Sequence, residues 1–131
     1  MHQAPTDETI LQGAHVLVVE DDFLISMELA SILTAAGAEV IGPSRNVAGA
    51  LALVDRNEIS AAILDVRLGD DTVAPVARGL SERNIPFLFY TGEASTDPIW
   101  REWPAAQVIS KPARPRSLVN AVATLINEAV R

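Results

Sequence analysis

Short apolar runs alternate with segments of helical periodicity along most of the chain. The apolar runs predict five strands, at residues 15–19, 38–41, 60–64, 86–90 and 107–109. The segments between and after them carry apolar residues every three or four positions and predict helices at residues 23–36, 46–56, 72–83 and 116–130. Strands that alternate with helices in this way are typical of an α/β domain.

Two segments differ from the rest of this pattern. Residues 61–64 are apolar without alternation, which indicates a strand buried on both faces of a sheet. The stretch between the fourth and fifth strands has no clear apolar stripe and contains Pro98, Trp100, Trp103 and Pro104. We therefore expect a short or irregular fourth helix near residues 97–103.

The alternation predicts a single domain built on a doubly wound, five-stranded parallel sheet with helices on both faces. Right-handed crossover connections favour the (βα)5 arrangement with strand order 2-1-3-4-5. Residues 1–13 are mostly polar and include Pro5 and Gly13, so we expect a flexible N-terminal tail there and a folded domain over 14–131.

The composition narrows the classes of function. The chain has 131 residues, enough for one core, and ten basic against seventeen acidic residues give a net charge of −7. Nucleic-acid-binding surfaces are normally basic, so we expect no nucleic-acid partner. The chain contains no cysteine, which excludes disulfides and thiolate metal sites. It shows neither an apolar run of transmembrane length nor a signal-peptide pattern, so we expect a cytoplasmic protein without a membrane partner.

Polar side chains that suit a reaction site follow the ends of the predicted strands. Glu20 and Asp21 follow the first strand, Asp65 the third, Thr91 the fourth and Lys111 the fifth. Because the carboxyl ends of parallel strands lie at one edge of a sheet, we expect these side chains to gather there. Taken alone, Asp65 could equally open a turn, since Asp is common in turns.

Three carboxylates at one edge repel one another and need a positive charge nearby. Mg²⁺ prefers oxygen ligands of this kind and commonly completes its shell with water and phosphate oxygens. We therefore predict an Mg²⁺ site formed by Glu20, Asp21 and Asp65, in which Asp21 binds the ion directly and Glu20 binds it through water. The backbone carbonyl of Arg67 would complete the ligands that the protein supplies.

Lys111 supplies a second positive charge and is the only lysine in the chain. A divalent cation and a lysine can neutralise the oxygens of a phosphoryl group while a carboxylate attacks it in line. We therefore predict Asp65 as the nucleophile and phosphorylation site, with Thr91 and Lys111 holding the phosphoryl oxygens. Gly92, beside Thr91, leaves room for the group to approach the backbone.

The motifs at these strand ends together resemble those of bacterial response-regulator receiver domains. They are Val-Leu-Val-Val-Glu20-Asp21-Asp22, Leu64-Asp65, Tyr90-Thr91-Gly92 and Ser110-Lys111-Pro112, and the resemblance covers residues 14–130. It implies the flavodoxin-like fold, a cis Lys111–Pro112 bond, and a phosphoryl group accepted on Asp65 with Mg²⁺ from a histidine kinase or phosphotransfer protein. It further implies a single-domain response regulator in two-component phosphorelay signalling, which binds a downstream protein partner or shuttles the phosphoryl group.

Residues 86–93 also resemble the fourth strand of the FAT GUY subgroup of stand-alone receivers. Tyr90 and Glu93 stand where that subgroup has Ala and Tyr. Typical receivers carry an aromatic residue three positions before the lysine, a place that Val108 occupies here, so the resemblance implies that the usual aromatic switch is absent or replaced.

Two further residues flank the predicted pocket. Arg67 and Glu93 lie two positions after Asp65 and Thr91, where receivers tune hydrolysis of the aspartyl phosphate, and they could pair across the mouth of the pocket. The resemblance thus implies modulating roles at Arg67, Gly92, Glu93 and Val108.

Other functions fit parts of the pattern. An Mg²⁺-dependent phosphohydrolase would turn over an aspartyl phosphate on small substrates, but such enzymes often carry a second acid where this chain has Arg67. A binding module that signals without phosphorylation is favoured by Val108. We expect no enzyme activity beyond phosphoryl transfer to Asp65 and its hydrolysis.

The first predicted helix carries two more alternatives. Asp22 precedes it and is better placed to cap the helix than to bind a metal. Phe23, Leu24 and Met27 make the helix apolar on more than one face. Either the helix is wedged into the core, or part of it docks a helix of a kinase or phosphotransfer protein.

Overall fold

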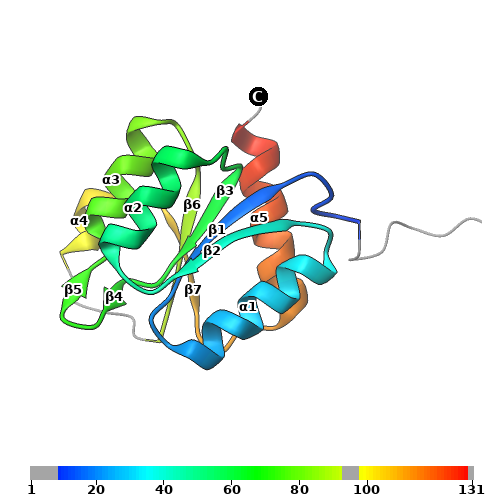
Figure 1. Ribbon diagram of the computed structural model, residues 1–131, viewed down its shortest axis with the longest axis horizontal. Coiled ribbons are helices and arrows are strands. Elements are labelled where there is room, and N and C mark those ends of the chain that lie inside the picture. Colours follow the sequence, from blue (N-terminus) through cyan, green and yellow to red (C-terminus); the bar gives the residue numbers. More distant parts are fainter. Residues whose placement is uncertain (1–8, 93–97, 130–131) are drawn as a thin grey trace, which may run out of the picture.

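The computed structural model describes residues 9–92 and 98–129 and contains a five-stranded parallel sheet with helices on both faces (Figure 1). The strands are β1 (His15–Val19), β2 (Glu39–Ser44), β3 (Ala61–Leu64), β6 (Phe87–Thr91) and β7 (Gln107–Ser110). They lie in the order β2-β1-β3-β6-β7, and each neighbouring pair is parallel. The doubly wound fold predicted from the sequence, with order 2-1-3-4-5, is confirmed.

The helices of the described residues are α1 (Phe23–Ala35), α2 (Val47–Arg56), α3 (Ala74–Glu82), α4 (Ile99–Glu102) and α5 (Pro115–Ala129). Helices α1 and α5 cover one face of the sheet, and α2, α3 and α4 lie on the other (Figure 1). None of these helices combines the length and apolar character needed to cross a membrane. Asp22 caps α1, because its side chain accepts the backbone N–H of Ile25 at 3.0 Å.

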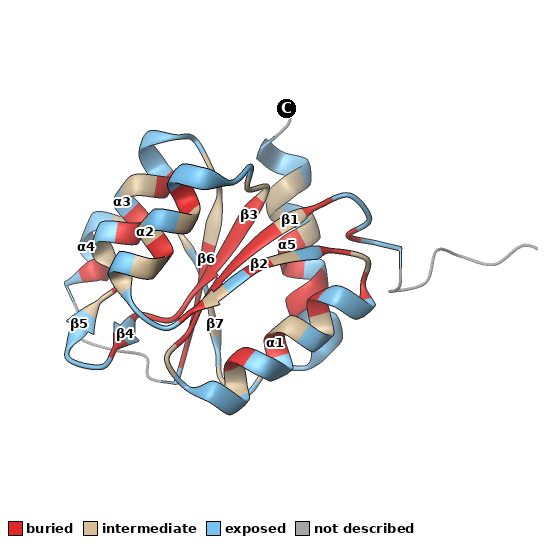
Figure 2. Cartoon of the chain, in the orientation of Figure 1, coloured by how far each residue is buried: buried red, intermediate tan, exposed pale blue. Residues whose placement is uncertain are grey.

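The core has two layers, one on each face of the sheet. Val16 and Val18 of β1 pack beneath α1 and α5, whereas Leu17 and Val19 pack beneath α2 and α3. Successive side chains of a strand point to opposite faces, so both sets are buried and the strand needs no polar alternation. Figure 2 shows β3 buried along its length and β1 buried beyond its first residue.

The fourth helix is short, as the sequence indicated. It spans four residues, and aromatic side chains hold it over β6 and α3. The Phe89 ring lies 5.3 Å from Trp100 and 6.5 Å from Trp103, both edge to face. The indole N–H of Trp103 also donates to Oγ of Ser81 in α3 at 3.1 Å.

Residues 67–72 form a small hairpin that the hydrophobic pattern did not predict. Its strands β4 (Arg67–Leu68) and β5 (Asp71–Thr72) are antiparallel. The turn uses Gly69 at φ 63°, a conformation that glycine adopts without strain. Because Asp71 and Thr72 pair in this hairpin, α3 begins at Ala74, two residues later than predicted.

Strand β2 runs further than the predicted 38–41. It continues through a cis Gly42–Pro43 bond to Ser44. Proline lacks the N–H that a central strand must donate, but β2 lies at the edge of the sheet, where proline is tolerated.

The predicted flexible tail over 1–13 needs a correction at its C-terminal end. Leu11 is only 2% exposed and packs in the core beneath α1 and α5. Its backbone N–H donates to the carbonyl of Ala36 at 2.8 Å. A buried leucine with a paired backbone belongs to the folded unit, so residues 9–13 are part of the domain; residues 1–8 lie outside the described residues.

Candidate functional site

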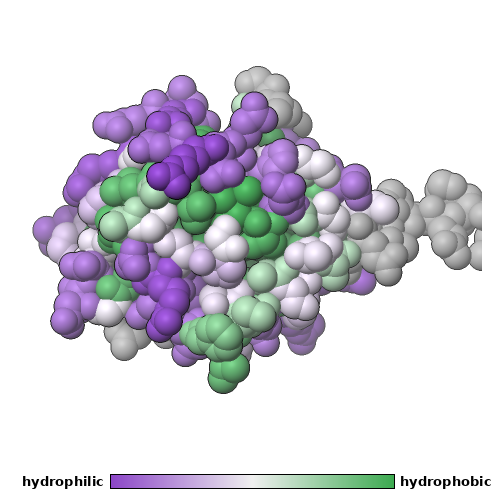
Figure 3. All heavy atoms as spheres, in the orientation of Figure 1, coloured by the Kyte–Doolittle hydropathy of each residue, from purple (hydrophilic) through white to green (hydrophobic). Residues whose placement is uncertain are grey.

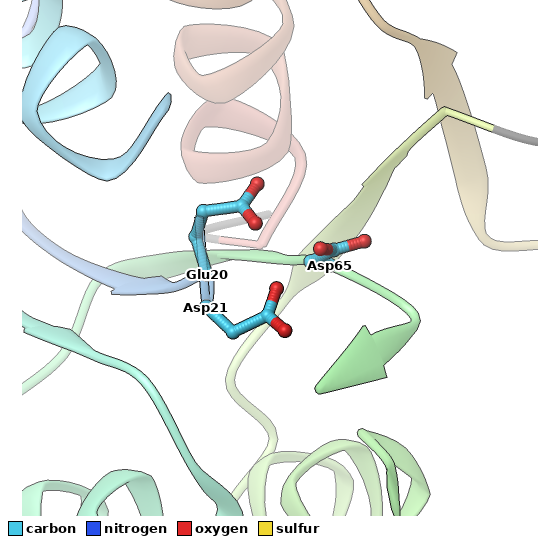
Figure 4. Close-up of side chains that lie close together, drawn as sticks. All are labelled: Glu20, Asp21 and Asp65. Atoms are coloured by element: carbon cyan, nitrogen blue, oxygen red, sulfur yellow. The ribbon is translucent and has the colours of Figure 1, made fainter. Parts of the chain in front are cut away.

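The carboxyl ends of β1 and β3 bring three carboxylates together (Figure 4). Glu20 and Asp21 follow β1 directly, Asp65 follows the neighbouring strand β3, and one oxygen of each lies within 4.8 Å of the others. Sheet pairing continues up to this point, since the N–H of Asp65 donates to the carbonyl of Val19 at 2.9 Å. Paired backbone therefore fixes where the side chains begin.

Glu20 is the most enclosed of the three. It is 1% exposed, and its Oε2 accepts the backbone N–H of Asp22 at 3.1 Å. Burial, followed by hydrogen bonding with Asp65, raises the pKa of Glu20 to about 7, although Lys111 acts in the opposite direction. Asp65 is 8% exposed and Asp21 is half-buried. The cluster is therefore closed around Glu20 and more accessible at Asp21.

Lys111 reaches this cluster from the end of β7. Its Nζ lies 2.6 Å from Oε1 of Glu20 and 3.2 Å from Oδ2 of Asp65. Burial by itself lowers the pKa of Lys111, but the hydrogen bond to Glu20 and the charge of Asp65 outweigh it, and the pKa is raised. The ammonium thus stays charged and bridges two of the three carboxylates. The Lys111–Pro112 bond is cis.

Thr91 and Gly92 lie at the end of β6. Thr91 is 5% exposed, and its carbonyl accepts the backbone N–H of Lys111 at 2.9 Å, which ties the two strand ends together. Gly92 is exposed, and a side chain added there would meet no atom of the described residues within 4 Å. The roles predicted for Thr91 and Gly92 stay predictions.

Two of the predicted modulating positions, Arg67 and Val108, are exposed. Arg67 is exposed at the start of β4, and Val108 is 44% exposed in the middle of β7. Glu93 lies outside the described residues, so its pairing with Arg67 stays a prediction. The same holds for the carbonyl of Arg67 as a metal ligand.

Two contacts at the site were missing from the sequence prediction. The backbone N–H of Gly69, in the β4–β5 turn, donates to Oδ2 of Asp21 at 2.9 Å. The hydroxyl of Tyr90 accepts the backbone N–H of Ala113 at 3.2 Å. Both join residues that are far apart along the chain. The sequence offered two signals for these contacts, a Gly-Asp turn motif and a tyrosine in an otherwise apolar strand. Neither signal identifies the residue at the other end of the hydrogen bond.

The cluster has the chemistry of a cation site. All three donors are carboxylate oxygens, the ligands that hard divalent cations prefer. Glu20 gives the cluster a buried acid whose charged form is disfavoured by its surroundings, and a cation would relieve that cost. Glu20, Asp21 and Asp65 therefore could hold a metal ion.

A family model, described as the response regulator receiver domain, matches residues 16–123. None of the curated proteins matches the sequence.

Solved structures resemble the fold over most of the chain. A CheY-like receiver domain protein from Methanospirillum hungatei JF-1 has a TM-score of 0.80 at 24% identity, with 89% of this chain and 96% of that chain covered. A response regulator receiver protein from Sinorhizobium medicae WSM419 has a TM-score of 0.79 at 25% identity, with 91% and 98% covered. The response regulator PhyR from Brucella abortus has a TM-score of 0.73 at 23% identity; 94% of this chain matches 52% of that longer chain.

Proposed function

Because the chain belongs to the family of response regulator receiver domains, we propose that it accepts a phosphoryl group on Asp65 in two-component signalling, with Mg²⁺ as the cofactor. The observation that carries this proposal is the position of Lys111. Its ammonium contacts Oδ2 of Asp65 and Oε1 of Glu20, so a positive charge already stands beside the acid that would attack. The donor would be a histidine kinase or a histidine phosphotransfer protein.

The reaction transfers a phosphoryl group from a histidine nitrogen to a carboxylate oxygen. An oxygen of Asp65 forms the new bond to phosphorus, the P–N bond of the donor breaks, and its electron pair returns to the imidazole. Glu20, Asp21 and Asp65 would hold Mg²⁺, which when bound neutralises charge on the phosphoryl oxygens.

The protein's own groups prepare this step. The Lys111 ammonium is held in advance next to Asp65, so it can stabilise charge on the incoming group with little reorganisation. Burial of Glu20 excludes water from the inner side of the cluster and strengthens these interactions. Thr91, at the end of β6, would offer its hydroxyl to a phosphoryl oxygen.

An exposed apolar patch beside the site supports docking of a partner. Phe23, Leu24 and Met27 at the start of α1 are 61%, 77% and 52% exposed. Figure 3 shows a hydrophobic protrusion at the N-terminal end of α1, the end that lies just after Asp21 in the sequence. Because α1 begins two residues after Asp21, a helix bound to this patch could present its phosphohistidine to Asp65. The alternative, in which these side chains are wedged into the core, does not hold.

We further propose that the protein is not a turnover enzyme. Arg67 stands two residues after Asp65, where a phosphohydrolase of this type often carries a second acid, and it is exposed. Phosphoryl transfer to Asp65 and hydrolysis of the product would be its only chemistry. Assignment to the FAT GUY subgroup stays a prediction.

Intact mass after incubation with a small acyl phosphate tests the proposal. We expect a single phosphoryl adduct in the wild type with Mg²⁺, and none without Mg²⁺ or in Asp65→Asn. Asp55→Asn is the matched control, since Asp55 is an exposed acid paired with Arg83 in another part of the molecule. An adduct that persists in Asp65→Asn, or no adduct in the wild type, would contradict the assignment.

A further inference from the structure

Tyr90 lies next to the proposed phosphoacceptor site but faces the other way. It is the residue before Thr91 in β6, and successive side chains of a strand point to opposite faces. Tyr90 is 2% exposed and packs in the core layer beneath α1 and α5. A buried tyrosine must find a partner for its hydroxyl, and in this structure both the ring and the hydroxyl contact the segment that carries Lys111.

The ring of Tyr90 lies beside the Lys111 ammonium. Nζ is 5.6 Å from the ring centroid, within the range of a cation–π contact. The negative face of the ring attracts the ammonium without using any of its N–H donors. Those donors remain directed to Glu20 and Asp65, and they would be available to phosphoryl oxygens.

The hydroxyl of Tyr90 holds the loop after β7. It accepts the N–H of Ala113, two residues after Lys111, at 3.2 Å. On the other side, the backbone N–H of Lys111 itself donates to the carbonyl of Thr91. Pro112, between them, has no N–H to donate. Two consecutive residues of β6 therefore fix the backbone at Lys111 and at Ala113.

We propose that Tyr90 is a positioning residue for Lys111 in phosphoryl transfer to Asp65. The inference rests on the proposed function. The ring holds the ammonium between Glu20 and Asp65, and the hydroxyl holds the loop from which the side chain extends. Its ring contacts Lys111 and its hydroxyl holds Ala113, so it acts on the site through the lysine.

A side chain that only fills the core would behave differently. Tyr90→Phe keeps the ring and nearly all the volume but loses the anchor to Ala113, whereas Tyr90→Leu loses the ring as well. A purely structural tyrosine would change stability in these variants and leave the rate of the folded protein unchanged. If Tyr90 positions Lys111, the phosphorylation rate should fall from the wild type to Tyr90→Phe and fall further in Tyr90→Leu.

The first arm of the test observes the contact itself. Lys111 is the only lysine in the chain, so protein labelled with ¹³C,¹⁵N-lysine gives one set of side-chain NMR signals. We expect the Cε and Hε signals to show the upfield shift of a group over the face of an aromatic ring, to keep it in Tyr90→Phe and to lose it in Tyr90→Leu. A lysine signal that Tyr90→Leu leaves unmoved would overturn the proposal whether or not Asp65 accepts phosphoryl.

The second arm measures phosphorylation by a small acyl phosphate with Mg²⁺. At saturating donor we expect a rate about tenfold lower in Tyr90→Leu, the size of effect that loss of a partly desolvated cation–π contact produces. In Tyr90→Phe we expect about a threefold loss, from one missing hydrogen bond. The Mg²⁺ concentration for half-maximal rate should stay within about twofold, since the carboxylates that would bind it are intact.

Phe87→Leu is the matched control for disturbed packing. Phe87 is an aromatic residue of the same strand, but it packs on the opposite face against Phe89 and Trp103. The Phe87→Leu variant should be less stable than the wild type but be phosphorylated at the same rate. Equal rates in wild type and Tyr90→Leu would overturn the positioning role. If the wild type takes up no phosphoryl group although Tyr90→Leu shifts its lysine signal, the proposed function is overturned, and the contact between Tyr90 and Lys111 has no catalytic role.

Discussion

Both faces of the sheet are covered along β1, whereas β7 is covered only in part. Val18 in β1 is 0% exposed, while Val108 in β7 is 44% exposed. This change in burial falls between the neighbouring strands β6 and β7, at two residues that are partners in register. Phe89 of β6 is buried under Trp100 and Trp103, and Val108, its partner in register on β7, is not. The one-turn helix α4 thus covers β6 and leaves β7 partly open.

This difference explains how the site is held. Glu20 and Asp65 extend from strands that are covered on both faces, so packing on both sides adds to the backbone hydrogen bonds that hold these residues. Lys111 extends from the strand with the least cover. Its backbone and side chain depend on specific contacts with β6, through the carbonyl of Thr91 and the ring of Tyr90.

The largest expected effect compares the same substitution in the two regions. Val18→Ala removes two methyl groups from the closed core and should lower the free energy of unfolding by about 2–4 kcal/mol. Val108→Ala, at an exposed position, should change it by less than about 0.5 kcal/mol. Urea denaturation of the two variants measures both values. A Val108→Ala loss close to that of Val18→Ala would show that β7 is buried in solution.

A smaller effect is expected at Glu20, which follows the covered strand β1, because protonation of this carboxylate should weaken Mg²⁺ binding. The pKa of Glu20 is raised to about 7, so the folded protein without metal holds a proton there at lower pH. A protonated carboxyl cannot serve a cation, so Mg²⁺ and the proton compete. The ionised fraction falls about tenfold between pH 8 and pH 6, and Mg²⁺ affinity should fall by about the same factor.

Calorimetric titration of Mg²⁺ at pH 6, 7 and 8 measures this dependence. Glu20→Gln carries no titrating proton at this position and should show weaker binding with a flatter pH profile. A wild-type affinity that does not change over this range would mean that Glu20 takes no part in binding the cation.

Most of the fold was predictable because the five sheet strands and the four longer helices each have a local signal. Apolar runs identified the five strands, and alternation with helices identified the sheet order. The features that were missed depend on neighbours distant in sequence. Leu11 is buried because it meets α1 and α5, and Pro43 stays in β2 because that strand lies at the edge of the sheet. Position in the three-dimensional fold, which the local pattern does not show, decided both.

The site was predictable in its side chains and less so in its supports. Glu20, Asp21, Asp65 and Lys111 stand at strand ends, and the order of the strands was enough to expect them at one edge. The hydrogen bond from Gly69 to Asp21 comes from a hairpin only a few residues long, whose two strands have two residues each. Strands of two residues are too short to show a periodic pattern in the sequence.

The smallest expected effect distinguishes which exposed apolar position contacts the protein that donates the phosphoryl group. Leu24, in the patch beside the carboxylates, is 77% exposed, and Val108, on the open strand, is 44% exposed. If the donor protein docks on α1, Leu24→Ser should slow transfer from a phosphorylated histidine phosphotransfer protein by several-fold, about the effect of removing one apolar interface residue. Val108→Ser is the control and should leave this rate unchanged. Both variants should react with a small acyl phosphate at the wild-type rate, because neither residue belongs to the carboxylate cluster. The opposite result, with transfer slowed by Val108→Ser alone, would move the docking surface to β7 and make the open strand, rather than α1, the side that meets the donor.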